Sequence, residues 1–268
     1  MSVENLFVEP RVAPLPGIGA RRIVQRNLAV YRRLWWVFAT GLIEPVLYLA
    51  GIGFGVGSLV GTVAFDGQRL PYTAFVAPAM MASAAMNGVL FDSMFGLFFK
   101  LRYSKVYEAV LSTPIGVTDI ALGEVAWALL RGTIYAAGFL LVMWLFGTIR
   151  SPLGILALPG SVLIGFCFAC VGSAVTTFMR NFRDFDITML VMMPIFLFSA
   201  TFYPISIYPP ALRIVVQLSP LTRSVDLLRS LTTGEVGPSI AVDVVYLLVL
   251  ALIGLVVASR RLERQLLK

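Results

Sequence analysis

Three ionisable residues lie inside apolar segments that are each long enough to cross a bilayer. They are Glu44, in the stretch GLIEPVLYL, Asp92 and Arg131. At a helical rise of about 1.5 Å per residue, each lies roughly 10–12 Å from the same end of its segment. A charge at that depth costs several kcal/mol unless it is paired or hydrated. The shared depth predicts that Arg131 binds Asp92 or Glu44 across helices, or that the group faces a wet cavity.

Two roles for this charge cluster stay open. The ion pair either locks helices together or contacts a substrate or a gate. Carboxylates at membrane depth also mark proton relays, so Glu44 and Asp92 suit an alternative function as a proton-coupled secondary transporter. Inverted repeats would support that alternative, and the sequence contains no convincing one.

Residues that perform catalysis are scarce in this chain. It has no histidine, which removes the commonest general base and metal ligand. No GxxxxGK[ST] stretch is present, so we expect no ATP site. Cys167 and Cys170 form CFAC in an apolar run and are expected to pack between helices rather than bind metal. The sequence therefore predicts a chain that is not an enzyme and binds neither metal nor cofactor itself. An enzyme acting on lipid head groups would need a dense polar cluster that the sequence lacks.

Membrane helices are the elements that must position these residues. Of the 268 residues, 59% are hydrophobic and only 13% charged, against about 45–50% and about 25% in soluble domains. About 20 apolar residues in a helix cross a bilayer core about 30 Å thick. Six segments reach roughly this length and predict an all-α integral membrane protein: 36–58, 73–98, 122–147, 154–179, 186–203 and 240–259.

Basic residues set the expected orientation. If the chain starts inside, fifteen of the 21 Lys and Arg residues lie on the cytoplasmic side and five on the other. The positive-inside rule then places both termini in the cytoplasm, and we expect the chain in the cytoplasmic membrane of a bacterium. This orientation gives a cytoplasmic N-terminus at 1–35, a transmembrane domain at 36–259 and a cytoplasmic tail at 260–268. The positive charge thus serves orientation, and we expect membrane lipids rather than nucleic acid as partners.

The segment GIGARRIVQRNLAVYRRL (17–34) alternates arginines with apolar residues. This pattern predicts an amphipathic helix lying on the inner leaflet, with an ordinary cytosolic helix as the alternative.

The loop 100–124 is expected to contain a short helix from Ser104 to Leu111, which Ser112-Thr113-Pro114 ends. This helix is either a lever for a cytoplasmic partner or a connector.

The segment 203–239 is too polar and too broken by proline for a membrane span. Its stretches RIVVQL and VDLLRSL are nevertheless amphipathic. Non-helical backbone at membrane depth survives only where protein or a water-filled cavity covers it. The segment therefore predicts a pair of short re-entrant helices in the outer leaflet, between the fifth and sixth spans, with a surface loop as the alternative.

Three stretches of the chain carry a family resemblance: PYTAFVAPAMMASAAMNG (71–88), YEAVLSTPIGVTDIALGEV (107–125) and LSPLTRSVDLLRSL (218–231). Together with the six-span layout, they resemble the permease subunit of ABC-2 type exporters. They occur in the family's order, so the resemblance covers nearly the whole chain. Within the family, it is closest to nodulation protein J-like lipooligosaccharide exporters and daunorubicin-resistance-type permeases. These patterns are specific to the family and not to a substrate.

The resemblance implies export of an amphiphilic substrate, such as a drug, lipid or glycolipid. It implies a homodimer that works with two copies of a separate ABC ATPase, which would hold ATP and Mg²⁺. Dimer contacts would come from spans one and five. The resemblance leads us to expect a neutral residue before Pro45, and Glu44 departs from this pattern. The implied coupling helix comprises Ser104, Lys105, Val106, Tyr107, Glu108, Ala109, Val110 and Leu111. The implied re-entrant segment that caps the path, 203–231, includes Tyr203, Pro204, Pro220, Asp226 and Arg229.

Overall fold

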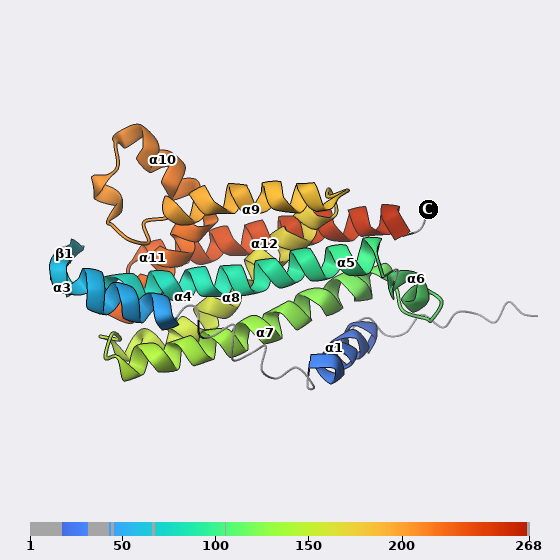
Figure 1. Cartoon of the computed structure of the whole chain (residues 1–268), viewed down its shortest axis with the longest axis horizontal. Coiled ribbons are helices and arrows are strands. Elements are labelled where there is room, and N and C mark those ends of the chain that lie inside the picture. Colours follow the sequence, from blue (N-terminus) through green and yellow to red (C-terminus); the bar gives the residue numbers. More distant parts are fainter. Residues whose placement is uncertain (1–17, 32–42, 44–45, 66–67, 105, 267–268) are drawn as a thin grey trace, which may run out of the picture.

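The computed structural model describes residues 18–31, 43, 46–65, 68–104 and 106–266. Most of these residues are helical, and the long helices run roughly along one axis of an elongated bundle (Figure 1). Glu44 and Lys105, which belong to the predicted charge cluster and coupling helix, lie outside the described residues.

Four helices of the described part are long and apolar enough to cross a membrane. They coincide with the second, third, fourth and sixth predicted spans. Their bounds are Tyr72–Arg102, Val117–Leu145, Pro152–Thr176 and Pro238–Leu266.

Two of these four runs change helix type along their length. The first consists of α4 (Tyr72–Phe91), a π-helical turn at Asp92–Gly96 and α5 (Leu97–Arg102). The third begins with a 3₁₀ turn at Pro152–Leu156 and continues as α8 (Ala157–Thr176). The other two are the uninterrupted helices α7 (Val117–Leu145) and α12 (Pro238–Leu266).

The first predicted span, 36–58, is described only in part. Its described portion is helical from residue 46, includes a π-helical turn at Ile52–Val56 and continues into α3 (Gly57–Val60).

The fifth predicted span, 186–203, corresponds to α9 (Phe182–Leu197), and its predicted C-terminal boundary is wrong. The chain turns sharply after the helix, with Ala200 at a positive φ of 55°. The hydroxyls of Ser199 and Thr201 lie 2.7 Å apart across this turn. Short polar side chains that bond locally compete with helix continuation, which explains why the helix ends early.

A two-stranded antiparallel hairpin precedes α4 and makes the fold mostly, rather than wholly, helical. Its strands are β1 (Thr62–Phe65) and β2 (Gln68–Pro71), with Val63 opposite Leu70. The sequence between the strands is Asp-Gly, which is a strong hairpin signal. The predicted all-α fold therefore did not include this short element.

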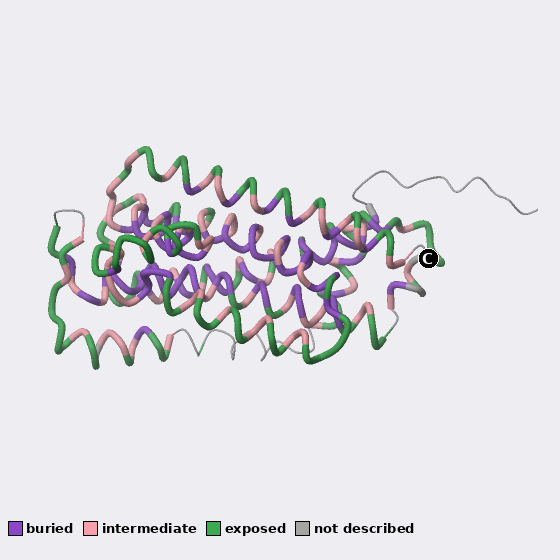
Figure 2. The backbone as a smooth tube through the Cα atoms, turned by 90° about the horizontal axis from the view of Figure 1, so that it is seen from above, coloured by how far each residue is buried: buried purple, intermediate pink, exposed green. Residues whose placement is uncertain are grey.

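The core lies around α4, which packs against α7, α8 and α11. Small residues bring the backbones close: a Cβ at Gly254 of α12 would lie 2.8 Å from the carbonyl carbon of Cys170 in α8. Both cysteines are fully buried there and unbonded to each other. By contrast, α9 has no buried residue, and Figure 2 shows burial concentrated in the central helices.

Two short helices follow α9, α10 (Pro210–Leu218) and α11 (Pro220–Thr233). Figure 1 shows them at the same end of the bundle as the hairpin. We call this the α11 end. The opposite end, which we call the α6 end, carries α1 (Ile18–Tyr31), α6 (Val106–Leu111) and the C-terminal end of α12.

Candidate functional site

The predicted coupling helix corresponds to α6, a six-residue helix between α5 and α7. It ends at Leu111, where the hydroxyls of Ser112 and Thr113 donate to the carbonyl oxygens of Ala109 and Val110 at 2.7 and 2.6 Å. Ser104 lies in the turn before the helix and is exposed, as is Ala109. The serine and threonine that follow the helix in sequence therefore terminate it, as the pattern predicted.

The side chain of Tyr107 packs α6 against the rest of the molecule. This side chain is 1% exposed and packs in a small apolar cluster with Ile23 of α1, Leu97 of α5 and Ile120 of α7. Burial, followed by the nearby negative charge of Glu124, raises the pKa of Tyr107 well above its usual range. The phenol therefore stays neutral, and α6 contacts three other helices through one buried ring.

The helix α1 lies against the first half of α7 through a narrow face. Gly19, Ile23 and Asn27, spaced four residues apart, are its buried positions, as one face of an α-helix requires. A Cβ at Gly123 of α7 would lie 2.8 Å from Cβ of Ile23. The absence of a side chain at Gly123 thus allows α1 and α7 to approach closely, with Arg21 and Arg22 left exposed on α1.

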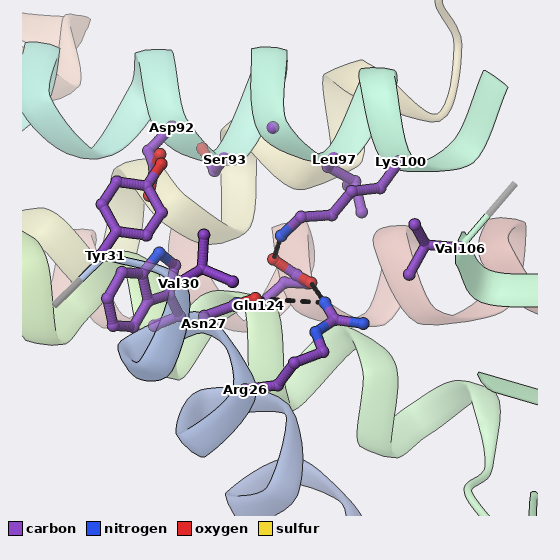
Figure 3. A pocket seen from close by; sticks show the side chains of 12 residues that line it. Arg26, Asn27, Val30, Tyr31, Asp92, Ser93, Leu97, Lys100, Val106 and Glu124 are labelled. Atoms are coloured by element: carbon purple, nitrogen blue, oxygen red, sulfur yellow. Dashed lines mark hydrogen bonds and ion pairs between the residues drawn. The ribbon is translucent and has the colours of Figure 1, made fainter. Parts of the chain in front are cut away.

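A buried carboxylate joins α1, α5 and α7 beneath this contact. Oε2 of Glu124 lies 2.6 Å from Nζ of Lys100, and Oε1 lies 3.6 Å from Nη2 of Arg26. Figure 3 shows Glu124 of α7 between the two cations, which reach it from different helices. The same view shows that these residues line one cavity of about 290 Å³.

The predicted pairing of Arg131 with a carboxylate is confirmed for Asp92. Nη1 of Arg131, in α7, donates to Oδ1 of Asp92 at 2.7 Å. The same nitrogen donates to the hydroxyl of Tyr31 at 3.2 Å, and the guanidinium lies 5.2 Å from the Tyr31 ring centre. Asp92 opens the π-helical turn of its span, and such turns are frequent at functional sites.

A second cavity of about 500 Å³ adjoins this ion pair. Arg131 and Tyr135 of α7 line it together with Asn87 of α4. The remaining wall is mostly apolar and includes Met189, Met192 and Phe196 of α9. Because Asp92 lines the first cavity and Arg131 the second, the ion pair lies at their boundary.

At the α11 end, Arg229 is the residue of the predicted re-entrant segment that contacts the most other elements. Its side chain is 1% exposed. Nε donates to the carbonyl of Phe75 at 3.3 Å and Nη2 to the carbonyl of Ala200 at 3.1 Å. The guanidinium also lies 3.9 Å from the ring centre of Phe75 and 5.1 Å from that of Phe65. One cation thus connects α11, α4, the hairpin and the turn after α9.

The other predicted residues of this segment are only partly brought together. Asp226 lies 3.7 Å from Arg229 across one turn of α11. Tyr203 packs against Tyr208 instead, with ring centres 5.3 Å apart. Pro204 precedes a 3₁₀ turn at Ile205–Ile207, and Pro220 is the first residue of α11, where proline is favoured.

The sequence did not predict that Glu124, Lys100 and Arg26 form one cluster. Glu124 and Lys100 mark ends of predicted spans, and Arg26 is one of several arginines on an amphipathic helix. The available signal is weak, because nothing in the sequence states which face of α1 meets α7. The spacing of Gly19, Ile23 and Asn27 gives that face only once Gly123 is known to lie opposite.

Comparison with known proteins identifies a family that matches most of the chain. The family described as ABC-2 type transporter matches residues 20–232. The chain is similar to Nodulation protein J of Rhizobium leguminosarum bv. viciae, with 29% identity over 96% of this chain and 99% of the relative. It is 31% identical to Nodulation protein J of Sinorhizobium fredii (strain NBRC 101917 / NGR234), over 90% of this chain and 94% of the relative. Nodulation protein J of Rhizobium meliloti (strain 1021) is also 31% identical, over 84% and 86%.

Proposed function

The chain belongs to the ABC-2 type transporter family and is a membrane subunit of such a transporter, and from this premise we propose that it is the permease of an exporter. It moves an amphiphilic substrate, such as a drug, lipid or glycolipid, out of the cell. A separate ATPase holds ATP and Mg²⁺ and supplies the energy. The observation that carries the coupling part of this proposal is the burial of Tyr107 among α1, α5 and α7.

In this proposal, the α6 end faces the cytoplasm and contacts the ATPase. The exposed positions Ser104 and Ala109 offer a surface to the partner, while Tyr107 passes a push on α6 to the helices behind it. Because packed interiors transmit displacement rather than absorb it, α1 and α7 move with α6. The Glu124 ion pairs then keep α1, α5 and α7 together during that movement.

The cavity of about 500 Å³ beside the Arg131–Asp92 pair favours an amphiphilic substrate. Its wall combines Arg131, Tyr135 and Asn87 with methionines and phenylalanines. Ligand sites commonly have such a mostly apolar lining with a few polar groups, and methionine adapts to different shapes. The cavity therefore suits a molecule with an apolar body and a polar group.

Two copies of the chain complete the path in our proposal. No residue of α9 is buried, and Leu190 and Met193 are 69% and 70% exposed. In a six-span arrangement, α9 and the segment that contains α3 serve as the fifth and first spans and face a second protomer. The α10–α11 pair then caps the path on the outer side.

The alternative is a proton-coupled transporter in which Glu44 and Asp92 take up and release protons. Asp92 accepts a 2.7 Å hydrogen bond from Arg131, so each protonation of Asp92 would have to break this ion pair. The match to the ABC-2 type transporter family favours ATP as the energy source instead.

Reconstitution tests the proposal. The chain is co-expressed with an ABC ATPase from its own genome, and transport of a fluorescent lipid into inside-out vesicles is followed. We expect transport to require ATP and both proteins, and to continue when a protonophore collapses the proton gradient. Transport that stops with the protonophore and proceeds without ATP would support the alternative instead.

Arg131→Ala distinguishes the structural role of the charge cluster from a transport role. A variant that is obtained in normal yield in detergent but transports nothing would show that Arg131 acts in transport. Loss of folded protein would assign it to helix locking.

A labelling experiment tests the proposed orientation. Cys167 and Cys170 are fully buried, so a cysteine introduced at exposed Ala109 becomes the accessible thiol. We expect a membrane-impermeant maleimide to label A109C only after the cells are opened. Labelling of intact cells would overturn the orientation.

A further inference from the structure

The wall of the cavity of about 290 Å³ at the α6 end carries two cations and two carboxylates, and a third cation, Arg131, pairs with one of these carboxylates from outside the wall. Arg26 and Lys100 both reach Glu124, the carboxylate at its centre. Asp92, the other carboxylate of the wall, already pairs with Arg131 at 2.7 Å. Among the described residues, Arg26, Lys100 and Arg131 therefore share two carboxylates, which leaves one positive charge in excess.

An unpaired polar atom points to the same conclusion. Asn27 is 5% exposed and lines this cavity. Its Oδ1 accepts a hydrogen bond from Nη2 of Arg26 at 3.1 Å. Its Nδ2 is buried and has no hydrogen-bond partner among the residues that the structure describes. A buried N–H donor without an acceptor is costly, so an acceptor at this position would stabilise the site.

The donors converge from two helices. Figure 3 shows Arg26 and Asn27 of α1 facing Lys100 of α5, with Glu124 between them. Guanidinium, ammonium and amide groups all donate, and together they match an anion that carries several oxygens. Phosphate is such an anion, and arginine binds it through charge-assisted hydrogen bonds. Basic pockets between membrane helices bind lipid head groups in this way.

The surroundings of the cavity fit a ligand that arrives from the bilayer surface. On α1, Leu28 and Val30 are 49% and 56% exposed, close to the residues that line the cavity, and Val30 is one of them. Apolar residues exposed beside basic ones are typical of a helix that lies in the membrane interface.

We propose that this cavity binds a phosphate ester anion, either the head group of an anionic phospholipid or a soluble phosphate. Arg26, Lys100 and Nδ2 of Asn27 hold its oxygens, and the bound anion neutralises the excess charge. The ligand then bridges α1 to α5 beside the Glu124 contact. Binding at this site is independent of export and does not require the ATPase.

The test uses the purified full chain after delipidation in detergent. Thermal unfolding is measured with added phosphatidylglycerol, phosphatidylcholine or inorganic phosphate, and native mass spectrometry counts retained lipids. We expect phosphatidylglycerol to raise the unfolding temperature in a saturable way, with phosphatidylcholine having little effect. A rise with inorganic phosphate, together with displacement of the lipid, would identify soluble phosphate as the source.

Two substitutions separate this site from general surface charge. Asn27→Leu removes the unpaired donor without changing the net charge and should weaken phosphatidylglycerol binding about tenfold. Arg26→Gln should weaken it by at least as much, which provides a second test if N27L folds poorly. Arg22→Gln changes an exposed arginine of the same helix and should leave binding within about twofold.

Three results would overturn the proposal. They are no response to any of the three additives, equal binding of phosphatidylcholine and phosphatidylglycerol, and an effect of R22Q as large as that of R26Q.

Discussion

The two ends of the bundle hold their cations in different ways. At the α11 end, Arg229 donates to two backbone carbonyls and lies between two aromatic rings. At the α6 end, Arg26 and Lys100 share the side chain of Glu124 beside a cavity. Backbone carbonyls are fixed by their helices and turns, whereas side-chain carboxylates change rotamer readily.

This difference indicates which end can move. Arg229 connects four elements through backbone carbonyls and packed aromatic rings, which are held in place by the fold. We therefore expect the α11 end to move as one unit. The contacts of Glu124 connect three helices through long side chains, so those helices can shift by small amounts and keep their ion pairs. Four substitutions test the comparison, from the largest expected effect to the smallest.

Among these four, Arg229→Ala should have the largest effect on stability. It leaves the carbonyls of Phe75 and Ala200 without this donor and opens a cavity between two rings. We expect a loss of about 3–5 kcal/mol in the free energy of unfolding, measured by denaturant titration in micelles. Arg213→Ala is the control, because Arg213 also donates to two carbonyls but in a more exposed position. If R213A and R229A lower the free energy of unfolding equally, burial is not what makes the contacts of Arg229 so stabilising.

Gly123→Val should have the next largest effect, confined to the α6 end. The new side chain would collide with Ile23, because a Cβ at position 123 would lie only 2.8 Å from Cβ of Ile23. Overpacking of this kind costs about 1–3 kcal/mol, and we expect α1 to become sensitive to limited proteolysis. Gly51→Ala is the control, since beyond its own helix no atom of the described residues lies within 4 Å of a Cβ there. Resistance of α1 to protease in G123V would contradict the proposed close contact.

Glu124→Gln should reduce stability moderately and transport strongly. The amide keeps the shape of the side chain but leaves Lys100 and Arg26 without a counter-charge. We expect a loss of about 1–3 kcal/mol, measured as for R229A, and loss of ATP-driven transport. The double variant Glu124→Met with Lys100→Met should recover stability, because apolar replacement of a buried ion pair is often neutral. If this double variant also transports normally, the ion pair has no part in coupling.

Tyr107→Phe should have the smallest effect. The hydroxyl of Tyr107 is buried near Glu124 but makes no well-formed hydrogen bond within the described part of the chain, so its removal should change stability by less than about 1 kcal/mol. Tyr107→Ala removes the ring and should cost about 3–5 kcal/mol, with loss of coupling to the ATPase. A larger cost for Y107F would mean that the hydroxyl, and not the ring, fastens α6.

The long apolar helices were predictable from sequence because hydropathy acts over about 20 residues at once. The pairing of Arg131 with Asp92 was also predictable, because an unpaired charge at that depth is too costly to leave alone. The Glu124 contacts were not predictable, since they depend on which face of α1 meets Gly123. The end of α9 depends on a local turn at Ser199–Thr201, and hydropathy alone does not detect such a turn.

The pairing of Arg131 with Asp92 has an electrical consequence. Moving one elementary charge across a membrane potential of about 100 mV involves about 2.3 kcal/mol. The two side chains sit 2.7 Å apart on neighbouring helices and carry opposite charges, so together they present almost no net charge to the field. If the two helices rock as a pair, the membrane voltage therefore exerts almost no net force on them through these two side chains.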